Sequence, residues 1–190
     1  MKILFLDVDG VLNDEQTCKR ATWKDDRTFF RPLYVERVNR ILAATGAKLV
    51  ISSSWRVRYS TLEELKAAFH KFGFDPDLVI DKTPTGYRGR RMSETMYRGL
   101  EIQHWLSDNA ENHDVESIVI LDDDQDMLHL DHRLIRTEGF RVPLDGGISE
   151  AQVAEAIALF NTPDDVHKRF DWDQFVDNRQ AHLNYLKDKS

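Results

Sequence analysis

The sequence predicts an α/β fold in which helices cover both faces of a central parallel sheet, giving three α/β/α layers. Short, continuously apolar segments have the length and composition of strands buried on both faces. Between them lie segments whose apolar residues recur at helical spacing, and the two patterns alternate along the chain. Such alternation implies right-handed crossovers between parallel strands. The carboxyl ends of the strands then share one edge, where α/β proteins bind their ligands.

Five segments are predicted to form the strands of this sheet. They are Ile3–Leu6, Lys48–Ile51, Leu78–Ile80, Ser117–Leu121 and Arg133–Thr137. The first four are short apolar runs, whereas the fifth carries arginine at two positions and is the weakest. The apolar runs favour central positions in a sheet that is covered on both sides.

Four segments are predicted to form the covering helices. The first, Leu33–Ala44, ends before Gly46, a residue that often terminates a helix. The second runs from Thr61, which opens a capping-box pattern, and closes at Gly73. A third covers Gly99–Leu106, and a fourth begins at Ser149 and continues to Phe160.

The composition indicates a globular protein without bulk affinity for nucleic acid or membranes. Of 190 residues, 41% are hydrophobic and 31% charged, and 26 basic against 33 acidic side chains give a formal net charge of −7. The single cysteine, Cys18, cannot form an internal disulfide. No apolar run approaches the roughly 20 residues of a membrane span. We therefore expect a soluble, cytoplasmic protein with no membrane partner.

Two stretches do not fit the alternation of strands and helices. Residues 14–32 are long for a connection and too short for a domain, so we expect them to form a flap. Residues 161–190 follow the last expected helix and carry apolar side chains that could share one helical face. The predicted organisation is one domain over residues 1–160, with residues 161–190 as a helical extension packed on it.

Acidic residues follow two of the predicted strands. Asp7 and Asp9 come directly after the first strand in the segment DVDG, and Asp122 and Asp123 follow the fourth in ILDDD. Buried carboxylates are costly unless something pairs with them. A calcium loop of EF-hand type would have its glycine at the sixth position, but Gly10 is fourth and follows a strand. We therefore expect these acids to hold another ligand at the edge of the sheet.

Four motifs occur in the order found in the haloacid dehalogenase-like (HAD) superfamily of phosphohydrolases. They are DVDG, SSSWR, a basic segment before a helix, and ILDDD. In sequence, the segments VISSSWR and RGLEIQHWL are most similar to the small HAD domains of RNA-repair and polynucleotide 3′-phosphatase proteins. This resemblance implies a Rossmann-like HAD fold. Substrate-selecting caps in this superfamily are inserted after the first motif or between the second and third. Here only the short flap is available, so we expect an essentially capless enzyme.

The acids suit a phosphomonoesterase that uses Mg²⁺ and an aspartyl-phosphate intermediate. Asp7 fits the role of nucleophile, and Asp9, two residues on, that of general acid and base. A divalent cation is needed to bridge an anionic nucleophile and an anionic phosphate. The expected metal ligands are Asp7 and Asp123, and the resemblance implies that the backbone carbonyl of Asp9 adds a third contact. Asp122 is a further candidate ligand.

The remaining catalytic groups would bind the phosphoryl oxygens. The resemblance implies that Ser52 donates a hydrogen bond to the phosphoryl group, and Ser53 is the alternative within the serine run. One basic side chain should neutralise the nucleophile and phosphate, and Arg98 is preferred over Lys82 for this role. Gly10 would let the chain turn sharply after the first strand.

An open site would admit large substrates. The flap and the loop before residue 98 mix basic and aromatic side chains, which suits contact with phosphates and bases of single-stranded nucleic acid. Arg56, Arg90 and Arg91 complete the candidate substrate-binding residues. The expected substrates are phosphorylated nucleic-acid ends or nucleotides. A phosphatase for a small metabolite or a phosphoprotein, and a phosphate-binding module without turnover, remain alternatives, and the sequence does not indicate an oligomeric state.

Overall fold

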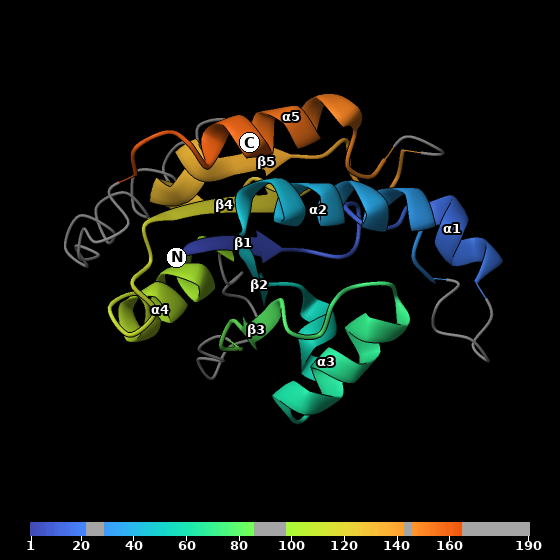
Figure 1. The fold of residues 1–190 in the computed structure, drawn as a ribbon. Helices are drawn as coiled ribbons and strands as arrows, with labels where there is room; N and C mark the ends of the chain where they lie inside the picture. Colours follow the sequence, from blue (N-terminus) through green and yellow to red (C-terminus); the bar gives the residue numbers. More distant parts are fainter. Residues whose placement is uncertain (22–28, 86–97, 143–145, 165–190) are drawn as a thin grey trace, which may run out of the picture.

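A computed structural model describes residues 1–21, 29–85, 98–142 and 146–164 and places a five-stranded parallel sheet at the centre of the molecule (Figure 1). The strands lie in the order β3-β2-β1-β4-β5, with every neighbouring pair parallel. Their bounds are β1 Lys2–Leu6, β2 Lys48–Ile51, β3 Val79–Lys82, β4 Ser117–Asp122 and β5 Leu134–Arg136. The predicted parallel sheet is confirmed, with strand ends that differ from the predicted ones by one or two residues.

The helices connect successive strands and cover the sheet. They are α1 Glu15–Arg20, α2 Pro32–Thr45, α3 Leu62–Lys71, α4 Arg98–Asn109 and α5 Glu150–Leu159, with 3₁₀ helices η2 Ser54–Arg58 and η3 Leu128–Arg133. The helix α1 was not predicted and lies within the segment expected to form a flap. The Asp14 carboxylate accepts a hydrogen bond from the Thr17 amide at 2.7 Å and so caps the first turn of α1. Residues 22–28 of the expected flap lie outside the described residues.

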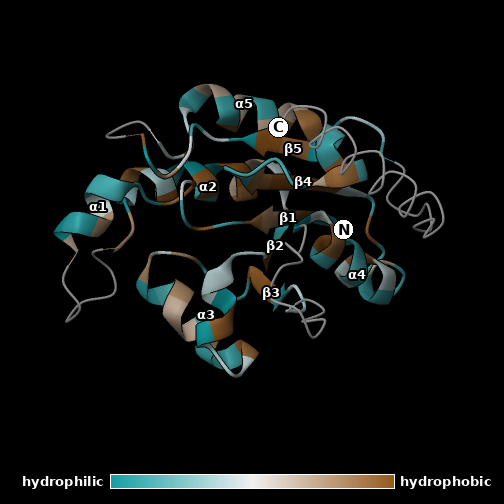
Figure 2. Ribbon diagram, turned by 180° about the vertical axis from the view of Figure 1, so that it is seen from behind, coloured by the Kyte–Doolittle hydropathy of each residue, from teal (hydrophilic) through white to brown (hydrophobic). Residues whose placement is uncertain are grey.

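The sheet divides the core into two hydrophobic layers. Leu4 and Leu6 of β1 pack in a cluster with α2, α3 and α5, while Ile3 and Phe5 pack with α4 on the opposite face. This alternation follows from the two-residue period of a strand. The strands are correspondingly brown in Figure 2, whereas the solvent-facing α1 is largely teal. The three-layer α/β/α prediction is therefore confirmed.

The register of the central strands aligns polar residues in one row. Leu6 of β1 pairs with Ile51 of β2 and Leu121 of β4. The next residue of each strand, Asp7, Ser52 or Asp122, therefore lies in the following row. The Asp7 amide still donates to the Leu121 carbonyl at 2.9 Å, and the Ser52 amide donates to the Leu6 carbonyl at 3.0 Å.

The same row faces α4. Two residues earlier in each strand, Phe5, Val50 and Ile120 belong to the hydrophobic cluster that packs with α4. Because alternate side chains of a strand share a face, the polar row follows them on that side of the sheet. The fold thus directs these polar residues toward the helix that begins with Arg98.

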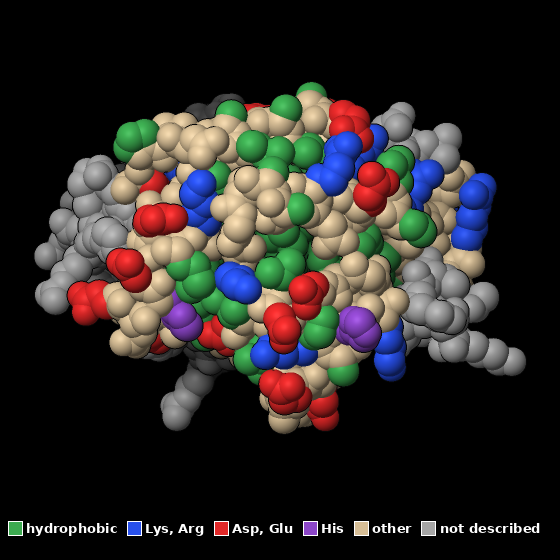
Figure 3. All heavy atoms as spheres, viewed as in Figure 1, with side chains coloured by type: hydrophobic (Ala, Val, Ile, Leu, Met, Phe, Trp, Pro, Cys, Tyr) green, Lys and Arg blue, Asp and Glu red, His purple; other side chains and the backbone are tan. Residues whose placement is uncertain are grey.

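Three further observations concern the surface, the helices and the end of the described chain. On the face that carries α2, acidic and basic side chains of the described residues are interspersed (Figure 3). None of the described helices is both long enough and apolar enough to cross a membrane. The Asp164 carboxylate accepts a hydrogen bond from the Ile118 amide at 3.2 Å, but the rest of the expected helical extension, residues 165–190, lies outside the described residues.

Candidate active site

Three aspartates from neighbouring strands meet at the carboxyl edge of the sheet. Asp7 follows β1, Asp122 ends β4 and Asp123 follows it, and one carboxylate oxygen from each lies within 4.8 Å of the others. Asp7 and Asp122 are buried, with 5% and 1% of their surface exposed, and Asp123 is partly buried. Such a set of hard oxygen donors suits a divalent cation. The Asp122 Oδ2 atom is buried and makes no hydrogen bond to the described residues, although the Arg98 guanidinium lies 3.3 Å from it.

The carboxylates disfavour one another's charge. Burial raises the pKa of Asp7 to about 6, and repulsion from Asp9 and Asp123 adds to this effect. Burial, followed by repulsion from Asp7, also raises the pKa of Asp122 well above its ordinary value. Burial likewise raises the pKa of Asp123. A cluster of this kind gains from a nearby positive charge, which the chain supplies in part.

Arg98 provides that charge from the first residue of α4. Its guanidinium lies 3.4 Å from Asp7 Oδ1 and 3.3 Å from Asp122 Oδ2, and it also donates to the Ser52 carbonyl. Burial opposes the charge of Arg98, but attraction by Asp7 and Asp122 raises its pKa overall. The Lys82 ammonium instead donates to the backbone carbonyls of Tyr59 and Arg56. Of the two expected cations, the structure brings Arg98 to the acids.

Both serines of the predicted pair lie near Asp7, in different hydrogen-bonding states. Ser53 makes a side-chain hydrogen bond to the Asp7 carboxylate, and its Oγ accepts the Trp55 amide at 3.3 Å. The Ser52 side chain is fully buried, and its Oγ has no hydrogen-bond partner among the described residues. An unsatisfied buried hydroxyl is costly, which favours Ser52 as the donor to a ligand oxygen.

Gly10 is required where the chain turns past Asp123. It has a φ of +80°, in the left-handed region, and a Cβ at this position would lie 2.4 Å from Asp123 Oδ2. The Asp123 Oδ2 atom accepts the Phe140 amide at 3.0 Å, and the Thr137 hydroxyl donates to the Gly10 carbonyl at 2.7 Å. These contacts hold Asp123 against the DVDG turn and leave no space for a methyl group.

We therefore expect Gly10→Ala to displace Asp123 and to lower the phosphomonoesterase activity that the resemblance implies by more than about tenfold at fixed Mg²⁺ concentration. Gly46→Ala is the matched control, because Gly46 also has a positive φ, +68°, but nothing lies within 4 Å of its Cβ position. Both variants should lose roughly 1–2 kcal/mol of stability through the strained backbone. Wild-type activity in Gly10→Ala at all Mg²⁺ concentrations would contradict the tight packing.

Two donors fix the Asp9 carboxylate beside the carboxylate cluster. The side-chain amide of Asn13 donates to Asp9 Oδ1 at 2.8 Å, and the indole N–H of Trp55 donates to Asp9 Oδ2 at 3.0 Å. The carboxylate is partly exposed and is not one of the three that converge at the edge of the sheet. The expected metal contact of Asp9 through its backbone carbonyl stays a prediction. The contact of Trp55 was not predicted, because no local pattern indicates a contact across 46 residues. Asn13 was also not predicted, although it lies only four residues after Asp9.

Arg56 was expected to bind substrate, but its buried side chain contacts groups inside the protein. It is 3% exposed and donates to the carbonyls of Ser52, Ser53 and Thr83, at 2.7–3.0 Å. Its guanidinium also pairs with Glu101 of α4 at 2.6 Å. All these partners are internal, so the structure gives Arg56 the task of fixing the turns after β2 and β3. Arg90 and Arg91 lie outside the described residues.

Asp126 anchors the start of the helix that carries Arg98. Its Oδ2 accepts the Arg98 amide at 2.8 Å, and its backbone carbonyl accepts the Gly99 amide at 3.2 Å. These contacts satisfy amides in the first turn of α4, which have no partner within the helix. The loop after β4 thereby positions the arginine that faces Asp7.

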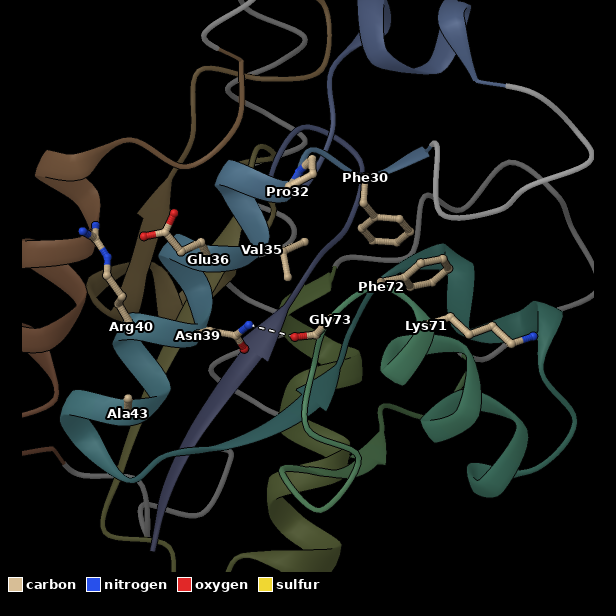
Figure 4. Close-up of a pocket in the computed structure, with 10 residues that line it drawn as sticks. All are labelled: Phe30, Pro32, Val35, Glu36, Asn39, Arg40, Ala43, Lys71, Phe72 and Gly73. Carbon is tan, nitrogen blue, oxygen red and sulfur yellow. Dashed lines mark hydrogen bonds between the residues drawn. The ribbon is translucent and has the colours of Figure 1, made fainter.

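A separate cavity opens on the side of the sheet opposite α4. It has a volume of about 610 Å³ and lies between α2 and the end of α3 (Figure 4). Phe30, Val35 and Phe72 line it, and the Asn39 side chain donates across it to the Gly73 carbonyl at 2.9 Å. None of the residues of the carboxylate cluster lines this cavity, so the cavity is separate from the candidate active site at the carboxyl edge of the sheet.

A parallel sheet with aspartates converging at the ends of β1 and β4 is the framework expected of a phosphatase-type hydrolase. Residues 3–153 match the family described as the HAD domain in Swiss Army Knife RNA repair proteins, and the chain belongs to this family. Membership implies a phosphatase-type hydrolase and confirms the resemblance to HAD domains of RNA repair. No curated protein and no solved structure gives a significant match to this chain.

Proposed function

We propose that this protein is a Mg²⁺-dependent phosphomonoesterase that forms an aspartyl phosphate on Asp7 and acts on phosphorylated nucleic-acid ends or nucleotides. The observation that carries the proposal is the convergence of Asp7, Asp122 and Asp123 within 4.8 Å, with the Arg98 guanidinium against Asp7. Phosphoryl transfer needs a nucleophile and positive charge around the transferred group. The carboxyl edge of this sheet offers both.

In the first step an Asp7 oxygen forms a bond to phosphorus while the bond from phosphorus to the ester oxygen breaks. Asp9 gives its proton to that leaving oxygen, so the product is an alcohol. In the second step Asp9 takes a proton from water as the water oxygen attacks phosphorus. The bond to Asp7 breaks, inorganic phosphate leaves, and Asp7 is regenerated.

The remaining groups stabilise charge during both steps. Mg²⁺ held by Asp7, Asp122 and Asp123 would neutralise negative charge on the phosphate oxygens. Arg98 lies beside Asp7 and would pair with a phosphoryl oxygen as the nucleophile loses its charge. Ser52, with its unpartnered hydroxyl, would donate to another phosphoryl oxygen.

The family description supports nucleic-acid substrates over small metabolites, because it names RNA repair proteins. The carboxylates lie at the carboxyl edge of the sheet and not in the cavity between α2 and α3. Phe29 and Phe30, expected to stack on bases, pack against Trp55 instead, so base contacts would come from other residues.

The proposal is tested with p-nitrophenyl phosphate, with added Mg²⁺ and after removal of metal by EDTA. We expect hydrolysis that is lost with EDTA and restored by Mg²⁺. Oligonucleotides with a 3′-phosphate or a 5′-phosphate, as RNA and as DNA, are then compared with a mononucleotide and a phosphopeptide. Higher kcat/KM on an oligonucleotide end or a nucleotide supports the proposed substrate class. Preference for the phosphopeptide, or absence of hydrolysis on every ester, would contradict it.

We expect Asp9→Asn to lower turnover of a 3′-phosphorylated oligonucleotide by about 10²–10⁴-fold, because the amide cannot transfer a proton. Steady-state kinetics on this substrate provide the measurement. Asp131→Asn, an exposed acid in η3, is the control and should keep wild-type kinetics. If Asp9→Asn kept its rate on an alkyl ester, Asp9 would not be the general acid.

A further inference from the structure

We propose that Trp55 is a positioning residue that fixes the carboxyl group of Asp9 for proton transfer. This inference rests on the proposed function, because it assigns Trp55 a role through the proposed general acid. It goes beyond the motifs, in which Trp55 has no assigned chemistry. The contact joins Trp55, in the 3₁₀ helix η2 after β2, to Asp9, in the turn after β1.

The Asp9 carboxyl group is clamped by one N–H donor on each oxygen. Trp55 Nε1 donates to Oδ2 at 3.0 Å, and Asn13 Nδ2 donates to Oδ1 at 2.8 Å. Asn13 is itself fixed, since its side-chain oxygen accepts the Gly10 amide at 3.1 Å and it is fully buried. Two donors from different parts of the chain therefore determine the plane of the carboxyl group.

Trp55 is a rigid donor because its ring is surrounded. The residue is 4% exposed, and Phe29 and Phe30 contact it edge-on at centroid distances of 5.8 and 5.3 Å. The Arg58 guanidinium lies 4.0 Å from the ring centroid. Phe72 packs on the same ring and stacks on Phe30. This packing leaves the indole few alternative orientations and holds its N–H toward Asp9.

The clamp restricts where Asp9 can carry its proton. Each carboxyl oxygen has two lone pairs, and one on each oxygen already accepts an N–H. A proton on Asp9 must occupy one of the two remaining positions, away from Trp55 and Asn13. The acid is therefore held with its transferable proton in a defined direction, which lowers the orientational cost of transfer to a leaving oxygen.

Trp55→Phe tests the clamp, since it keeps an aromatic ring in the cluster and removes the N–H. Proton donation matters most when the leaving group is a poor one, so two esters are compared, p-nitrophenyl phosphate and an alkyl phosphate such as a 3′-phosphorylated oligonucleotide. We expect kcat on the alkyl ester to fall by about 10- to 100-fold. The first step on the aryl ester, measured as the pre-steady-state release of nitrophenolate, should change by less than about threefold, because nitrophenolate leaves without protonation.

Trp105→Phe is the matched control. Its Nε1 also donates to a carboxylate, Asp81 Oδ2 at 2.6 Å, and its ring is also buried, but it belongs to α4 and packs in the hydrophobic layer between α4 and the sheet. This variant should show the same ratio of alkyl to aryl activity as the wild type. Thermal unfolding of both variants shows whether each is folded at the assay temperature.

Should Trp55→Phe fold poorly, Trp55 alone can be replaced by benzothienylalanine, which has the shape of tryptophan with sulfur in place of the N–H. A selective loss on the alkyl ester supports the inference. Equal losses on both esters, or no loss, would overturn the inference while leaving the phosphatase assignment intact. A wild-type protein without Mg²⁺-dependent hydrolysis of either ester would overturn the proposed function and the role of Trp55 with it.

Discussion

Asp7→Asn should lower turnover by about 10⁴-fold or more on aryl and alkyl phosphates alike. The amide has nearly the shape of the carboxylate, but it can neither attack phosphorus nor contribute negative charge to a metal site. The Asp7 side chain is buried in a cluster where burial and neighbouring acids disfavour its charge. The variant should therefore fold as well as the wild type. Thermal unfolding and steady-state kinetics measure the two effects.

The control for this prediction is Asp77→Asn, the same substitution at an exposed residue that precedes β3 at the opposite edge of the sheet. It should keep wild-type kinetics. An Asp7→Asn protein with most of its activity would exclude a covalent intermediate on this residue. An aspartyl phosphate trapped on Asp7 of the wild type, and missing from the variant, would identify the nucleophile directly.

Arg98→Ala should lower kcat by about 10²–10³-fold, the usual effect of removing one group that stabilises transition-state charge. It should also lower the unfolding temperature in the absence of metal, because Asp7 and Asp122 would lose the guanidinium that lies 3.4 and 3.3 Å from their carboxylates. Lys82→Ala should leave kcat within about threefold of wild type, since the Lys82 ammonium contacts backbone carbonyls. Parallel kinetics on one ester settle which residue is the cation of the site.

Arg98→Lys refines this comparison. A lysine keeps the charge but cannot contact Asp7, Asp122 and the Ser52 carbonyl together, so we expect an intermediate rate. The assay temperature must lie below the unfolding transition of each variant. A greater loss of kcat in Lys82→Ala than in Arg98→Ala would reverse the assignment.

The fold and the location of the acids could be predicted because they depend on local pattern and topology. Buried parallel strands are continuously apolar, so the first polar residue after each run marks the carboxyl edge of the sheet. This pattern predicted that Asp7, Ser52 and Asp122 each follow an apolar run at the carboxyl edge of the sheet. The structure shows that the three strands are neighbours and that the register aligns these residues in one row. Their catalytic roles stay predictions, although the geometry brings the acids close enough to share an ion.

Features that depend on long-range side-chain contacts could not be predicted in the same way. Arg56 was expected to bind substrate, yet its guanidinium donates to four backbone carbonyls and pairs with Glu101. Asp126 contacts the amide of a residue 28 positions earlier. The Asp9 contact of Trp55 spans 46 residues. No periodicity or spacing in a single sequence encodes such pairs, because they arise only when the sheet brings distant turns together.

The short helix α1 could not be predicted from the sequence for a different reason. Its six residues include no buried side chain, so it lacks the apolar periodicity by which helices are predicted. The Asp14 cap and an ion pair between Lys19 and Glu15, at 2.9 Å, accompany it instead. Capping residues alone are common in loops, and the segment was accordingly expected to form a flap without a helix.

The direct test of the central claim is a crystal structure of the protein with Mn²⁺ as an anomalous scatterer in place of Mg²⁺. We expect one strong anomalous peak at the carboxyl edge of the sheet, within about 2.0–2.3 Å of oxygens from Asp7 and from Asp122 or Asp123. The peak should disappear when Asp7→Asn is combined with Asp123→Asn. Anomalous density only elsewhere, with these carboxylates uncoordinated at saturating Mn²⁺, would contradict a shared metal site and the phosphoryl-transfer chemistry built on it.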